Sequence, residues 1–241
     1  MCDVIRVEEW LANARASCPN INRAERRYGP IPSFQAVKSI VLASQYGIEK
    51  GVDEACWDRQ VHFRLLSLAL RRPLDSIKGG PVNFTPSTAA AIHTGFMKGA
   101  LSRMVDFCVC IDSDVVGDQD PAISSAINNV REASGYASVN HTSHFHRNKP
   151  ISLSIESKQR NASRDDAHLQ IGVWHSAQWT YFDRLAQKRG VTRESLPFLP
   201  GLIVQAQQPG EGMGLFLLCA VSGLVAASTC WLQQKTNQIG D

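Results

Sequence analysis

The sequence has no Cys-x-x-Cys pair, no repeat of fixed period and little excess of charge of either sign. Its seven cysteines are odd in number, and charges interrupt residues 1–15, where a signal peptide would need an apolar core. We therefore expect free thiols and an intracellular location, nuclear or cytoplasmic. The missing repeat excludes solenoids and propellers. The net charge of +3 permits an anionic partner without requiring one, because dedicated nucleic-acid modules are usually far more basic.

Apolar residues make up 44% of the 241 positions, which is enough for a buried core and excludes global disorder. Their distribution divides the chain into a polar, irregular N-terminal segment (1–30), a folded domain (31–208) and an apolar C-terminal tail (209–241). Residues 213–232 of the tail carry no charge and, as a helix, are long enough to cross a bilayer. Their glycine, serine and threonine content also fits a buried core helix, or a tail produced by an altered reading of the gene's end.

Hydrophobic periodicity predicts helices and strands in an order typical of an α/β (α+β) domain with a mixed sheet. Helices are expected at 33–46, with Gly47 as the stop, and at 53–72, 121–133 and 165–189. Residues 75–100 are expected to form a loop with a short helix near 89–96. Strands are expected at 105–111, 150–158 and 198–204, and in the second of these Ile151, Leu153 and Ile155 should share one apolar face.

The residues with the clearest chemistry are Glu156 and Lys158, together with Asp106 on the other strand. Two residues apart on a strand, Glu156 and Lys158 project from the same face. A carboxylate pair from neighbouring strands supplies the hard oxygen ligands that Mg²⁺ prefers. The lysine could orient a metal-bound water and stabilise charge on a phosphate. The alternative is a solvated strand face that carries an ordinary ion pair.

Several longer segments, taken in order, resemble one family. These are DEACWDRQVHFRLLSLAL at 53–70, VDFCVCID at 105–112, SVNHTSHFHRNKPISLSIESK at 138–158, AHLQIGVWHSAQWTYFDRL at 167–185 and LPFLPGLIVQ at 196–205. Together they resemble the PD-(D/E)XK nuclease-like domain of fungal proteins. The resemblance implies a restriction-endonuclease-like fold, a mixed central sheet flanked by helices. It also implies cleavage of phosphodiester bonds in nucleic acid, DNA rather than RNA, with Mg²⁺ (or Mn²⁺) and no organic cofactor.

Carried over by this resemblance, Asp106 matches the Asp of the motif, Glu156 its (D/E) and Lys158 its Lys. Gln170 is similar to the glutamine of the Q-x-x-x-Y helix motif of exonuclease-like members. It would lie beside the metal site or the nucleic acid. These four residues are the expected catalytic set, with Asp106 and Glu156 as the metal ligands.

The chain departs from the family pattern in its first helix. There the acidic position falls on Gln60, whose amide is a poorer metal ligand than a carboxylate, and Glu54 or Asp58 could substitute for it. The closing Trp-bearing segment of the family is also absent after Gln205. A second hypothesis is therefore a catalytically inactive module that binds nucleic acid or another partner, or a protein anchored in a membrane by its tail.

Two further clusters have alternative readings. His141, His144 and His146 lie close together as in a zinc site, but no cysteine or carboxylate stands at ligand spacing beside them. Cys108 and Cys110 lie on the strand next to Asp106. They are expected to be small buried hydrophobic residues, with thiol catalysis as the alternative.

Overall fold

A computed structural model describes residues 32–71, 80–97, 103–112, 115, 121–135, 138–142, 146–158, 163–190 and 198–205. The predicted segments 1–30 and 209–241 lie outside the described residues, and so does the candidate span 213–232. In the parts of the chain that are described, no helix is both long and apolar enough to cross a membrane.

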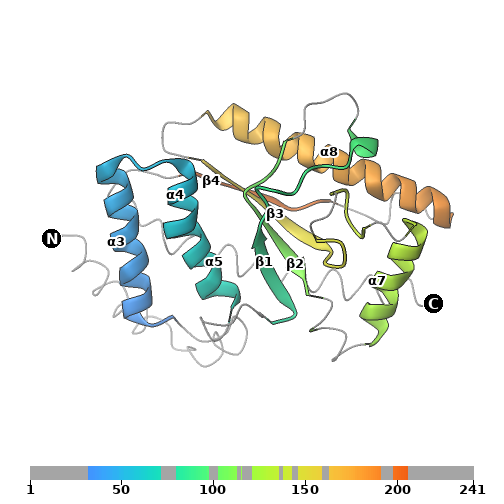
Figure 1. The fold of residues 1–241 in the computed structure, drawn as a ribbon, viewed down its shortest axis with the longest axis horizontal. Helices are drawn as coiled ribbons and strands as arrows, with labels where there is room; N and C mark the ends of the chain where they lie inside the picture. The colour runs from blue at the N-terminus through green and yellow to red at the C-terminus, as the bar shows by residue number, and fades with distance from the viewer. Residues whose placement is uncertain are drawn as a thin grey trace.

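A four-stranded mixed sheet forms the centre of the molecule and helices flank it, as the sequence predicts (Figure 1). Strands β1 to β4 lie side by side in that order; β1–β2 and β2–β3 are antiparallel, and β3–β4 is parallel. The strands are β1 (Val82–Pro86), β2 (Phe107–Ile111), β3 (Ile151–Lys158) and β4 (Gly201–Gln205). The helical elements are α3 (Phe34–Lys50), α4 (Glu54–Trp57), η1 (Asp58–His62), α5 (Phe63–Leu70), η2 (Thr94–Phe96), α7 (Pro121–Ala133) and α8 (Arg164–Arg189).

Strand β1 lies in the segment that the sequence predicts to be a loop, so that prediction is wrong. The strand has five residues and ends at Pro86. Proline cannot donate a ladder hydrogen bond and is therefore confined to edge strands or strand ends, which hides such a strand from a periodicity search. The short helix expected at 89–96 is only the single 3₁₀ turn η2.

Both faces of β2 are buried, because α5 covers one face of the sheet and α8 the other (Figure 1). Phe107 and Val109 pack on the α5 side and Cys108 and Cys110 on the α8 side, so side chains alternate along β2. The strand starts at Phe107 rather than at 105, and Val105 packs on the α8 side instead of sharing the face of Phe107 and Val109.

The predicted face of β3 needs one correction. Leu153 and Ile155 pack on the α5 side, but Ile151 packs on the α8 side. The pairing with β2 shifts between Val109 and Cys110, where a β-bulge leaves one extra residue on β3. An extra residue reverses the side-chain alternation beyond it, so Ile151 moves to the other face.

The first helix, α3, begins as expected after Ser33, whose hydroxyl accepts a hydrogen bond from Ala36 N at 3.3 Å. It does not stop at Gly47 but runs to Lys50, and Gly51 ends it with a φ of 60°. Gly47 serves a packing role instead. A Cβ atom there would lie 2.8 Å from the ring of Trp57, so only glycine lets the two helices approach this closely.

The helix expected at 53–72 is observed at 54–70 as α4, η1 and α5 in succession. Asp53 caps it by accepting a hydrogen bond from Cys56 N at 2.7 Å. Its middle, η1, is a π-helical turn, which the periodicity of the sequence does not reveal. Such turns occur frequently at functional sites.

The helix expected at 165–189 is confirmed as α8, with Ser163 as its N-cap and Gly190 in left-handed conformation at its end. Its residue Trp174 faces the sheet, is fully buried, and donates a hydrogen bond to Ser154 Oγ on β3 at 2.9 Å. The helix expected at 121–133 is confirmed as α7. The last strand, predicted as buried over 198–204, starts later at Gly201 and is only partly buried, because it lies at the edge of the sheet.

Candidate active site

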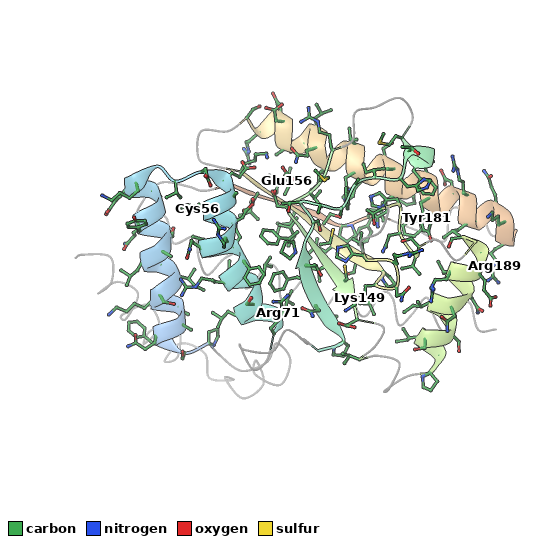
Figure 2. All side chains as sticks on the ribbon, viewed as in Figure 1. Cys56, Arg71, Lys149, Glu156, Tyr181 and Arg189 are labelled. Atoms are coloured by element: carbon green, nitrogen blue, oxygen red, sulfur yellow. The ribbon has the colours of Figure 1, made fainter. Side chains whose placement is uncertain are left out.

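The candidate site lies where one end of the sheet meets α4 and η1. Asp106 directly precedes β2, and Glu156 and Lys158 lie in the last part of β3. Asp106 N donates to the carbonyl oxygen of Ile155 at 3.1 Å, and Asp106 Oδ2 accepts from Ser157 N at 2.7 Å. Figure 2 shows Glu156 between α4 and α8. The sheet pairing itself therefore brings the residues of the two predicted strands together.

Glu156 and Lys158 form an ion pair, as their spacing predicts, but the pair is buried rather than solvated. Lys158 Nζ lies 2.7 Å from Glu156 Oε1 and 3.3 Å from Glu54 Oε1 on α4. Glu156 is 0% exposed and Lys158 is 9% exposed. The side chain of Glu54 is 39% exposed, so it marks the solvent side of the cluster. The end of β3 and helix α4 thus enclose Lys158 together with the carboxylates of Glu156 and Glu54.

The carboxylate of Glu156 has unsatisfied binding capacity. Among the described residues, neither of its oxygens has a hydrogen-bond partner of normal geometry, although Lys158 is close enough for an ion pair. Burial raises its pKa from an ordinary 4.5 to about 8, with Lys158 opposing and Asp106 and Glu54 reinforcing the shift. An ionised carboxylate buried without full hydrogen bonding is unfavourable. A divalent cation would supply the missing partner, so these residues fit a metal ion.

Burial also raises the pKa of Asp106 from 3.8 to about 6, the hydrogen bonds from Ser157 oppose the shift, and the charge of Asp58 adds to it. Asp58 and Asp106 are linked through one hydroxyl: Ser157 Oγ lies 2.5 Å from Asp58 Oδ1 and 3.0 Å from Asp106 Oδ2. A hydroxyl has one proton, which serves two carboxylates here. The site therefore concentrates more negative charge than its own hydrogen bonds balance.

Lys158 stays protonated in this setting. Burial alone lowers the pKa of a lysine, but the ion pairs with Glu156 and Glu54 outweigh it, and the net pKa lies above the ordinary 10.5. The ammonium group is thus a fixed positive charge and hydrogen-bond donor at neutral pH, and it cannot act there as a general base.

Helix α4 and the π turn η1 supply Glu54 and Asp58 to the site, and not Gln60, the acidic position that the resemblance implies. The side chain of Gln60 is exposed, whereas Asp58 is 9% exposed and faces Ser157. Glu54, Asp58 and His62 are spaced four residues apart and therefore share one side of the helix. That spacing is the signal in the sequence that identifies the inward face, and Gln60 does not belong to it.

Gln170 of α8 contacts the backbone that leads into Asp106 rather than the carboxylates. Its Nε2 donates to the carbonyl oxygen of Met104 at 2.6 Å. The residue therefore ties α8 to the segment before β2.

The other two clusters have different environments. His144 lies outside the described residues; His141 is fully buried, and burial lowers its pKa to about 3. Within the described segments, no three His, Cys, Asp or Glu side chains converge closely enough to hold a metal by themselves. Mg²⁺ is commonly held by only one or two carboxylates, with water and substrate phosphate completing its shell. Cys108 is 0% exposed, and burial raises the pKa of its thiol to about 12. It therefore packs as a small buried hydrophobic residue, as expected.

Comparison with known protein families gives a match over most of the chain. The model of the PD-(D/E)XK nuclease superfamily matches residues 7–208. No curated protein and no solved structure matches the chain. The matched range includes the whole sheet and every residue of the candidate site, and the mixed sheet flanked by helices is consistent with the restriction-endonuclease-like fold. The chain belongs to the PD-(D/E)XK nuclease superfamily.

Proposed function

We propose that this chain is a metal-dependent nuclease that hydrolyses phosphodiester bonds of nucleic acid, with Mg²⁺ or Mn²⁺ held by Asp106 and Glu156. The observation that carries the proposal is the carboxylate of Glu156, fully buried beside Lys158 and without a hydrogen-bond partner of normal geometry in the described structure. Membership in a nuclease superfamily supports the reaction class. The metal would, when bound, polarise the phosphate and lower the pKa of a coordinated water.

Each residue of the candidate site then has a distinct part in the reaction. The carboxylates of Asp106 and Glu156 hold the cation, and Asp58 and Glu54 add negative charge from the helix side. Lys158 remains positive, so it orients the attacking water by hydrogen bonding and stabilises the charge that develops on the phosphate. Gln170 positions Asp106 through its hydrogen bond to Met104.

A catalytically inactive module that binds nucleic acid or another partner is the second candidate. Closure of the site favours it, because Asp106, Glu156 and Lys158 are each less than a tenth exposed. Within the described cluster the side chain of Glu54 is the exposed one, so a phosphate would approach from its side or after local opening. Such a module would retain binding without turnover.

We further propose DNA over RNA as the substrate, no organic cofactor, and an intracellular location, nuclear or cytoplasmic, with a membrane association through 213–232 as the alternative. Free thiols support the intracellular location, since Cys56, Cys108 and Cys110 are all unpaired with one another. A fungal source is part of the same proposal.

The test is cleavage of labelled single- and double-stranded DNA and RNA by the full chain, with Mg²⁺, Mn²⁺ or EDTA. Asp106→Asn replaces one proposed metal ligand, and Lys158→Ala removes the ammonium group that is proposed to orient the attacking water. Lys149→Ala is the matched control, since Lys149 also forms an ion pair at 2.7 Å, with Asp112, away from the site. We expect metal-dependent cutting that both site variants lose and the control retains. Binding by a folded protein that never cuts would favour the inactive module.

A further inference from the structure

Five buried side chains form one continuous chain of contacts from Trp57 of α4 to Asp106, directly before β2. Trp57 Nε1 donates to His62 Nε2 at 3.2 Å, and His62 Nδ1 lies 2.8 Å from Asp58 Oδ1. Ser157 Oγ then contacts Asp58 Oδ1 at 2.5 Å and Asp106 Oδ2 at 3.0 Å. All five residues are less than a tenth exposed. The contacts therefore start at Trp57, which has no part in the proposed reaction, and end at Asp106, a proposed metal ligand.

The first contact fixes the proton on the histidine. The indole nitrogen of Trp57 is only a donor, so the ring nitrogen that faces it, Nε2 of His62, must accept. In a neutral imidazole the proton then sits on Nδ1, which faces Asp58. His62 is thereby held as a donor to Asp58.

The π turn makes this arrangement possible. Its backbone bonds reach five residues instead of four, and Trp57 and His62 are five residues apart. Gly47 of α3 leaves the space that the indole ring occupies. The polar groups of Trp57, His62, Asp58 and Ser157 are buried around this turn. Their burial carries a desolvation cost that apolar side chains at the same positions would avoid.

We propose that Trp57 and His62 are positioning residues: Trp57 selects the tautomer of His62, and the Nδ1–H of His62 holds Asp58 against Ser157, which orients Asp106. This inference rests on the proposed function, because it assigns these residues to the same site. Groups that orient the ligands of a metal typically contribute 10–100-fold to metal affinity or activity.

Mn²⁺ affinity of the full-length protein, measured by calorimetry, tests the assignment. His62→Phe keeps an aromatic ring but removes the donor, and we expect Mn²⁺ to bind about 10–100-fold more weakly. His62→Asn places an amide donor near the position of Nδ1 and should restore most of the affinity. The control is His141→Phe, the same substitution at a histidine that is fully buried outside this chain of contacts. It should leave Mn²⁺ affinity unchanged.

A folded His62→Phe protein with wild-type Mn²⁺ affinity would overturn the proposal, and so would equal losses in the Phe and Asn variants. A second measurement needs no metal and no altered His62. In ¹⁵N-histidine NMR of the metal-free protein, we expect His62 as the Nδ1–H tautomer in the wild type and a mixture in Trp57→Phe. An Nε2–H tautomer in the wild type refutes the positioning role. Absence of Mn²⁺ binding to a wild type with the expected tautomer refutes the proposed function instead.

Discussion

Replacing Glu156 with glutamine should change how the stability of the metal-free protein depends on pH. The pKa of Glu156 is raised to about 8, so the folded state keeps a proton that the unfolded chain, with an ordinary pKa of 4.5, loses. A raised carboxyl pKa makes the free energy of unfolding fall as pH rises from about 4.5 to about 8. Between pH 5 and 7 the full shift corresponds to roughly 2–3 kcal/mol, and screening by solvent near Lys158 reduces it to about 1–2 kcal/mol.

Urea unfolding of wild type and Glu156→Gln in EDTA, followed by circular dichroism at pH 5, 6, 7 and 8, measures this difference. The other titrating groups are common to both proteins, so the difference between the two curves isolates Glu156. We expect the variant to gain about 1–2 kcal/mol on the wild type between pH 5 and 7. Parallel curves would refute the reasoning, because they would mean that Glu156 is ionised in the folded, metal-free protein.

Four other variants give three further predictions. Lys158→Ala should lower turnover about 10²–10³-fold and leave Mn²⁺ affinity largely intact, as measured by single-turnover cleavage and calorimetry, since the ammonium acts on the reaction rather than on the cation. Because burial lowers the pKa of His141 to about 3, the free energy of unfolding of the wild type should fall by about 2–4 kcal/mol between pH 6.5 and 3.5 on account of this residue. His141→Phe should lack this part of the fall, as measured by urea unfolding in acid. An equal fall in both proteins would mean that His141 is charged in the folded state. Gly47→Ala should destabilise by about 1–3 kcal/mol through its clash with Trp57, whereas Gly172→Ala, at a helical position with open space, should stabilise by about 0.5–1 kcal/mol; equal urea midpoints for the two variants would contradict the packing argument.

The sequence predicts most of this fold because the main elements obey local rules. The helix expected at 165–189 and the strand expected at 105–111 depend on residues close together in the chain, and both elements are observed, the strand from Phe107 onward. The pairing of Glu156 with Lys158 follows in the same way from the period of a strand. Local periodicity is therefore sufficient to place the two strands that carry the site.

What the sequence does not predict depends on long-range contacts or on irregular backbone. The bulge that moves Ile151 to the other face is set by pairing between two strands, not by either strand alone. Ser157 meets Asp58 across 99 positions of sequence, so no spacing rule connects them. The resemblance alone does not give the phase of the helix that contains Gln60, which turns Gln60 outward and Asp58 inward.

The charges gathered at the site lead to a last prediction, about proton release. Four carboxyl groups gather at the site: Glu54 and Glu156 contact the ammonium of Lys158, and Asp58 and Asp106 contact Ser157. Burial raises the pKa of Asp106 and of Glu156. At pH 7, a pKa of about 8 leaves Glu156 mostly protonated, so Lys158 then has its salt bridge with Glu54 and a neutral contact with Glu156. A pKa of about 6 leaves Asp106 mostly ionised at the same pH. Binding of a cation requires both carboxylates to be ionised, so it should release about one proton at pH 7. Calorimetric titration with Mn²⁺ in buffers of different ionisation enthalpy counts that proton, and its absence would mean that the cation does not bind at Glu156.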